Sequence, residues 1–163
     1  MSKRFPLIIM PWNGYLNILQ ESGRSASLKR VYEHLLPGGE FVLDVEIYSQ
    51  NDFFANEDTN DNQSGLWDDW VKVDKSLKVR ERKTVIPSAD NQIAEERFDF
   101  QVDTRGKICT ETTSIFIASL RAEEILTEIA QAGFDISGIW SNFTDETNTN
   151  IDRKLVICAR KPD

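Results

Sequence analysis

Two short stretches carry the aromatic and polar side chains best suited to hold a small molecule. Trp12, Asn13 and Tyr15 follow a short apolar run, and Asp44 and Glu46 close another. An aromatic face attracts a cationic group, and an amide can orient a polar one. A carboxylate can act as a general base or bind a cationic group. These residue types therefore allow recognition of a small polar molecule, with proton transfer as a further possibility.

A structural role competes with each of these candidates. Trp12 and Tyr15 could pack on the following helix while Asn13 makes a turn. Asp44 and Glu46 could form a solvated strand end. The residue types alone do not decide between the two alternatives.

The remaining reactive side chains predict no metal or nucleophile centre. His34 is the only histidine, and it lies in the last turn of a predicted helix, where its charged form favours the helix dipole. Cys109 and Cys158 lie in strand-like runs without metal-ligand spacing, which is typical of reduced core cysteines. We therefore expect no metal site.

The first 48 residues predict a strand, a helix and a second strand. Residues 6–11 form an apolar run bounded by prolines, and residues 22–36 carry apolar side chains at helical spacing. Residues 37–39, Pro-Gly-Gly, end this helix, and an apolar strand at residues 41–43 follows and ends on Asp44. A crossover of this length implies two parallel strands whose carboxyl ends share one edge of the sheet. Both candidate stretches then lie at that edge, where open α/β sheets bind ligands.

Residues 49–120 differ in character. Residues 49–64 are rich in Asn, Asp and Glu and predict a loop, and alternating patterns at residues 77–80, 98–102 and 107–120 predict an antiparallel sheet with one wet face. Trp67 and Trp70 stand before this sheet. Their spacing also suits a packed helical turn, so a binding role competes with packing.

The last 43 residues return to an α/β pattern. Residues 121–132 predict an amphipathic helix with acidic residues in its first turn, and residues 136–140 and 155–159 are apolar strands separated by a polar loop. Trp140 and Asn142 lie where the first of these strands ends.

Three segments of the chain, which occur in the family's order, resemble segments of a class I S-adenosylmethionine-dependent methyltransferase. The first is the segment Pro-Trp-Asn-Gly-Tyr-Leu at residues 11–16, and the second is Leu-Leu-Pro-Gly-Gly-Glu-Phe-Val-Leu-Asp at residues 35–44. The third is Ala-Gly-Phe at residues 132–134. In that family such segments follow the fourth strand, join a helix to the fifth strand, and form a late turn. The resemblance covers residues 7–160 and begins at the family's fourth strand.

The resemblance implies a fold, a cofactor and a site. The expected fold is α/β: a partial Rossmann-like sheet made of family strands four to seven, the last antiparallel, with an inserted antiparallel sheet. S-adenosylmethionine would lie over Pro11, Trp12, Asn13 and Gly14. A small-molecule methyl acceptor would face a substrate set made of Tyr15, Asp44, Glu46, Trp67, Trp70, Trp140 and Asn142.

The family's glycine-rich cofactor loop has no counterpart among the eight glycines, because no closely spaced set follows a strand. We therefore expect a truncated, substrate-side portion of such an enzyme, with cofactor binding by this chain alone in doubt. An apolar first strand without a neighbour would pair through residues 7–10 with a second copy or a partner chain. The alternative is a non-catalytic binding or dimerisation module, and an unrelated α+β ligand-binding fold is a third interpretation.

Composition sets the outer limits. The 163 residues, 40% hydrophobic and 28% charged, predict one domain, with a core at residues 1–48, an insertion at 49–120 and a closing segment at 121–163. A net charge of −8 opposes binding to nucleic acid, and no apolar run is long enough to span a membrane. We expect a cytoplasmic protein.

Overall fold

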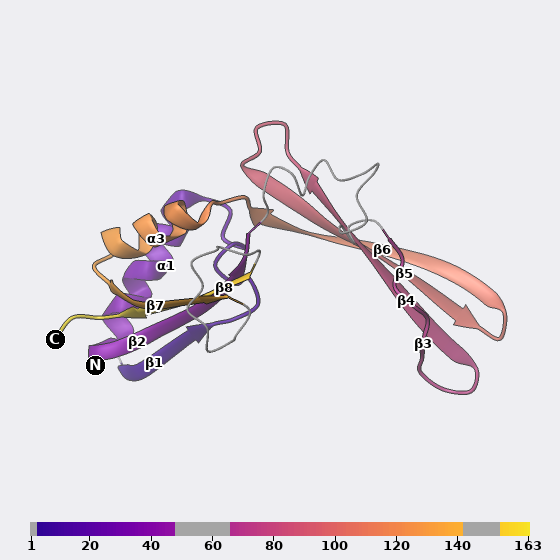
Figure 1. Ribbon diagram of the computed structural model, residues 1–163, viewed down its shortest axis with the longest axis horizontal. Helices are drawn as coiled ribbons and strands as arrows, with labels where there is room; N and C mark the ends of the chain where they lie inside the picture. Colours follow the sequence, from indigo (N-terminus) through magenta and orange to yellow (C-terminus); the bar gives the residue numbers. More distant parts are fainter. Residues whose placement is uncertain (1–2, 48–65, 142–153) are drawn as a thin grey trace. The chain divides into compact units, whose positions relative to one another are not determined.

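The computed structural model describes residues 3–47, 66–141 and 154–163 (Figure 1). The chain divides into two compact units. The first unit comprises Met1–Ser49 and Ala118–Asp163, and the second comprises Gln50–Ile117. That the two units form one domain, with the boundaries given above, stays a prediction.

The first unit is built on a four-stranded mixed sheet. Its strands are β1 (Phe5–Met10), β2 (Leu35–Glu46), β7 (Asp135–Ser141) and β8 (Lys154–Arg160), in the order β1-β2-β8-β7. β1 and β2 are parallel, and β8 is antiparallel to both of its neighbours, β2 and β7. The carboxyl ends of β1, β2 and β7 therefore share one edge. The predicted parallel pair and the antiparallel last strand are both confirmed.

Two helices, α1 (Glu21–His34) and α3 (Ala122–Gln131), cover the same face of this sheet (Figure 1). The rings of Tyr32 from α1 and Phe41 from β2 both contact the ring of Phe134, at centroid distances of 5.2 and 5.9 Å. The interior between helices and sheet is apolar. Its most deeply buried side chains are Leu16, Leu28, Leu35, Phe41, Leu43, Ile125, Ile129, Leu155 and Ile157.

The helix-to-strand joint differs from its prediction. α1 ends at His34, and Leu35 already belongs to β2, whereas the sequence pattern carried the helix to residue 36. Pro37 accounts for the early end, because helices usually end at or before the residue that precedes a proline. At this joint the amine of Lys161 donates to the carbonyls of Tyr32 (2.8 Å) and Leu35 (3.1 Å). Gly38, with φ of 69°, lies in the following register shift between β1 and β2.

β1 is the edge strand of the described sheet. Leu7 and Ile9 are 50% and 62% exposed, and they lie on the face of the sheet opposite Phe41, because they pair with Glu40 and Val42. An apolar strand such as this one is typical of a sheet covered on both faces, but within the described residues this face of β1 is open. A large apolar surface stays open along β1.

The second unit is a four-stranded antiparallel sheet. Its strands are β3 (Val71–Lys72), β4 (Leu77–Pro87), β5 (Ile93–Thr104) and β6 (Lys107–Ala118), in the order β3-β4-β5-β6. β5 and β6 are joined through Gly106, whose φ is 86° and whose N–H donates to the Asp103 carboxylate. The antiparallel sheet predicted from alternation is confirmed.

Within the described part of the chain, no helix is long and apolar enough to cross a membrane.

Candidate functional site

The rim loop, residues 11–20, follows β1 at the edge where β2 also ends. Trp12 and Asn13 both adopt the left-handed conformation, with φ of 59° and 55°. For residues other than glycine this conformation costs on the order of 1–3 kcal/mol each, and it persists only where the surroundings hold it. Inside the loop, the Asn13 carbonyl accepts hydrogen bonds from the N–H groups of Leu16 (2.9 Å) and Asn17 (3.1 Å).

Two reciprocal hydrogen bonds fasten the front of the rim loop to β2. The backbone N–H of Trp12 donates to the Asp44 carboxylate (2.8 Å), and the backbone N–H of Glu46 donates to the Asn13 side-chain oxygen (2.5 Å). The structure thus brings together the two stretches that the sequence placed on one edge. Asp44 is only 8% exposed, and its carboxylate binds the backbone of the rim loop.

This attachment presents the Trp12 indole to solvent. The residue is 85% exposed, although its backbone is fixed by Asp44. Gly14 completes the turn, because a Cβ there would lie 2.9 Å from the Met10 side chain and 3.0 Å from the Pro11 carbonyl oxygen. The result is an anchored loop with an open aromatic face at the carboxyl edge of the sheet.

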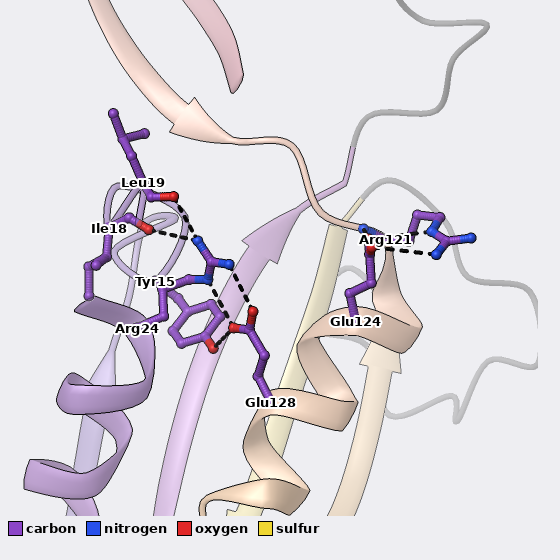
Figure 2. A network of polar contacts seen from close by, with 7 residues as sticks. All are labelled: Tyr15, Ile18, Leu19, Arg24, Arg121, Glu124 and Glu128. Carbon is purple, nitrogen blue, oxygen red and sulfur yellow. Dashed lines mark hydrogen bonds and ion pairs between the residues drawn. The ribbon is translucent and has the colours of Figure 1, made fainter. Parts of the chain in front are cut away.

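Tyr15, placed in the substrate set above, is part of the rim loop, and its side chain points into the interior toward α3 (Figure 2). It is fully buried, and its hydroxyl donates to the carboxylate of Glu128 on α3 (Figure 2). Burial, together with the hydrogen bond and negative charge of Glu128, raises the pKa of Tyr15 well above its usual value. Tyr15 is therefore a neutral packing residue in this structure, and its substrate role stays a prediction without geometric support.

Arg24 and Glu128 form a buried ion pair that the sequence analysis missed. Arg24 is 4% exposed, and its Nε and Nη2 donate to the two Glu128 oxygens at 2.9 and 2.8 Å (Figure 2). Burial alone would raise the pKa of Glu128, but hydrogen bonds from Arg24 and Tyr15 outweigh it and lower that pKa. One signal was available, because Arg24 shares a helical face with the apolar Leu28 and Val31.

Trp140 lies at the same edge of the sheet as the rim loop, near the end of β7. Its indole ring packs over Gly138, where a Cβ would come within 2.1 Å of the ring. The residue is partly exposed. Asn142, predicted beside it, lies outside the described residues.

Trp67 and Trp70 belong to the second unit and not to a helical turn. The Asp68 N–H donates to the Glu81 carbonyl of β4 (2.7 Å), so this segment runs along the sheet. The Arg80 guanidinium lies 4.8 Å from the ring centroids of both tryptophans. Both rings thus contact the sheet of their own unit, and their substrate role stays a prediction.

The described residues contain no group of three or more His, Cys, Asp or Glu side chains that could hold a metal ion.

The chain has the same fold as several proteins of known structure. No family model and no curated protein matches the chain. A S-adenosylmethionine-dependent methyltransferase from Clostridium acetobutylicum ATCC 824 matches 100% of this chain and 61% of its own, with a TM-score of 0.71 at 12% identity.

Two further solved structures agree. An amino pentose methyltransferase from Micromonospora echinaspora, involved in calicheamicin biosynthesis, matches 99% of this chain and 60% of its own, with a TM-score of 0.70 at 16% identity. A sugar N-methyltransferase from Streptoalloteichus sp ATCC 53650 matches 100% and 58%, with a TM-score of 0.70 at 12% identity. The chain has the fold of class I S-adenosylmethionine-dependent methyltransferases, as the resemblance implied, and spans about 60% of the length of these structures.

Proposed function

We propose that this chain is the substrate-side portion of a S-adenosylmethionine-dependent methyltransferase that acts on a small molecule. The observation that carries the proposal is the rim loop: an anchored turn, at the ligand-binding edge of a methyltransferase fold, that holds the Trp12 indole open. Two of the similar structures are described as amino pentose and sugar N-methyltransferases. An amine-bearing acceptor is compatible with the net charge of −8.

The residues of the rim loop fit one side of the cofactor. Pro11, Trp12, Asn13 and Gly14 would lie beside it, with the indole face toward the positive sulfonium. The bound cofactor supplies an activated methyl group for an in-line displacement, which demands orientation and exclusion of water more than a protein nucleophile. A glycine-rich loop, contributed by another segment, would hold the rest of the cofactor.

On the acceptor side we assign different roles to the predicted residues. Glu46 and Trp140 would face the acceptor, because both lie at the carboxyl edge of the first unit's sheet. Asp44 would position Trp12 through the hydrogen bond to the Trp12 backbone. Tyr15 would support the rim loop from the interior through its hydrogen bond to Glu128. Trp67, Trp70 and Asn142 stay in the proposed substrate set on the strength of the resemblance alone.

The open edge of β1 would receive the segment that completes the sheet. The backbone of β1 pairs only with β2 in the described sheet, and Leu7 and Ile9 expose apolar surface beside that edge. An apolar edge strand is a template for pairing with another strand. About 40% of the length of each similar structure lies outside the part that this chain matches, which is enough to supply such strands. We propose a cytoplasmic protein that pairs there with this missing portion.

A second candidate function rests on the same edge. The unit could be a non-catalytic module that dimerises through β1, because its exposed apolar strand suits pairing with a second copy. In that case Trp12 would have no ligand. The two candidates differ in what they predict for cofactor binding and for the size of the protein in solution.

Calorimetric titration with S-adenosylhomocysteine tests the proposal. Saturable binding that Trp12→Leu weakens tenfold or more, while Phe116→Leu, at an exposed aromatic residue of the second unit, leaves it unchanged, would support the methyltransferase portion. A folded chain that shows no binding and sediments as a dimer would favour the second candidate. Translating the DNA upstream of the coding sequence adds an independent check, because a strand followed by a glycine-rich loop supports the first.

A further inference from the structure

The rear half of the rim loop is held by a different set of contacts from the front half. The carbonyls of Ile18 and Leu19 both accept hydrogen bonds from Arg24 Nη1, at 3.1 and 2.9 Å (Figure 2). The Leu16 carbonyl accepts a hydrogen bond from the Ala118 N–H at 2.7 Å. These contacts fix the loop where it turns into α1.

Arg24 can hold these carbonyls because its own position is fixed. The planar guanidinium presents its donors in a rigid fork, and two of its nitrogens are bound by the Glu128 carboxylate of α3. The fork therefore ties three elements together: α3 on one side, and the loop and α1 on the other. A neutral residue at position 128 would leave Arg24 buried without a counter-charge.

Tyr15 connects the same carboxylate to the strained turn. Its hydroxyl donates to the Glu128 oxygen that also accepts from Arg24 Nε. Tyr15 directly follows Gly14, and the Asn13 carbonyl just before them accepts the N–H groups of Leu16 and Asn17. A movement of the Tyr15 ring is therefore transmitted to the left-handed Asn13 and Trp12.

We propose that Tyr15, Arg24 and Glu128 are positioning residues that clamp the rear of the rim loop to α3, as Asp44 clamps its front to β2. The clamp sets the direction of the Trp12 indole without touching a ligand. The part of this inference that concerns ligand affinity rests on the proposed function. The part that concerns loop rigidity does not.

The experiment compares Tyr15→Phe with Tyr32→Phe in the full chain. Each variant removes one tyrosine hydroxyl, but the Tyr32 side chain contacts Phe134 and Lys161 and lies outside the clamp. Amide hydrogen exchange is followed at Leu16, Asn17 and Ile18, with the amides of β8 as the reference. S-adenosylhomocysteine affinity is measured on the same samples.

In Tyr15→Phe we expect the loop amides to exchange at least tenfold faster while the β8 amides stay unchanged, and ligand affinity to fall at least threefold. Tyr32→Phe should show neither change. Glu128→Gln, which keeps the side-chain shape, should also accelerate the loop amides, and by a larger factor than the β8 amides, because the loss of the ion pair lowers global stability as well. Loop exchange unchanged in Tyr15→Phe, or accelerated equally in β8, would overturn the clamp.

The two proposals can fail separately. If the unaltered chain binds no S-adenosylhomocysteine but Tyr15→Phe still frees the loop amides, the clamp stands and the proposed function fails. If the chain binds this ligand and Tyr15→Phe changes neither loop exchange nor affinity, the proposed function stands and the clamp fails.

Discussion

In the first unit two helices bury one face of a mixed sheet, whereas in the second unit all but one of the β4 residues and most of the β5 residues are partly exposed. The first interior is made of large apolar side chains such as Phe41 and Ile157, both with no exposed surface. Among the described residues of the second unit, the buried set includes the charged Glu96 and Asp99. The two units therefore depend on different interactions.

Polar contacts across neighbouring strands organise one face of the second unit. Arg82 donates to Asp99 at 2.6 Å, and the Thr112 hydroxyl donates to the same carboxylate at 2.7 Å. Arg80 donates to the Gln101 side-chain oxygen at 2.6 Å. Because the Arg82 side chain is 36% exposed, solvent screens its pair with Asp99 and reduces what the pair contributes to stability. The comparison teaches that single substitutions should disrupt the first unit strongly and the second unit weakly.

The largest effect is expected in the apolar core of the first unit. Phe41→Ala should lower the free energy of unfolding by about 4 kcal/mol, because it removes a fully buried ring and leaves a cavity. Urea unfolding measures this loss. The matched variant Phe98→Ala, at a partly exposed ring of the second unit, should cost about 1 kcal/mol. Equal losses in the two variants would contradict the comparison.

The buried ion pair should come next, with a defined pH dependence. Glu128→Gln should cost about 3 kcal/mol near pH 7, because Arg24 stays buried without its partner. The pKa of Glu128 is lowered from its ordinary value of 4.5, so the stability that it contributes is complete above about pH 4.5 and is lost as the pH falls through the lowered pKa.

Urea unfolding at pH 7 and at successively lower pH follows this loss. The difference between the variant and the unaltered chain should shrink only in the acidic range. Glu95→Gln is the control in the second unit, where the partner Arg97 side chain is 43% exposed, and it should cost clearly less at pH 7. If the loss of stability in Glu128→Gln were the same at every pH, the result would argue against a charged Glu128 carboxylate in the unaltered chain.

A smaller effect is expected where aromatic rings cover the second sheet. Trp67→Leu should cost about 1 kcal/mol, because the Trp67 ring lies 4.8 Å from both Arg80 and Arg82. Hydrogen exchange should report the loss in the amides of β4 and leave those of β2 unaffected. Acceleration in β2 would mean that the two units do not unfold independently.

The smallest stability effect is expected at the exposed indole of the rim loop. Trp12→Leu should change the free energy of unfolding by less than about 0.5 kcal/mol, since the side chain is 85% exposed. The same variant should lose most ligand affinity if the proposed function holds. Thermal unfolding beside calorimetric titration separates the two quantities. A large loss of stability would show that the indole packs in solution.

Local patterns predicted most of the elements. Apolar spacing and alternation gave both helices, the parallel pair and the antiparallel sheet, because periodicity reports which face of an element meets a core. The antiparallel direction of the final strand came from the resemblance to the methyltransferase family. The end of α1 was misplaced by two residues. Pro37 is the local signal for this end, because helices usually end at or before the residue that precedes a proline.

For the candidate site, too, the sequence determined one part and the tertiary structure another. The sequence by itself determined that Trp12, Asn13, Asp44 and Glu46 share one edge, because parallel strands joined by a crossover helix must end together. Only the tertiary structure decided which side chain faces solvent and which holds the backbone. The Arg24–Glu128 pair joins residues 104 positions apart, and no local pattern specifies a partner at that distance. Burial, which turns Tyr15 inward and Trp12 outward, is set by the packing of α3 and β2 together.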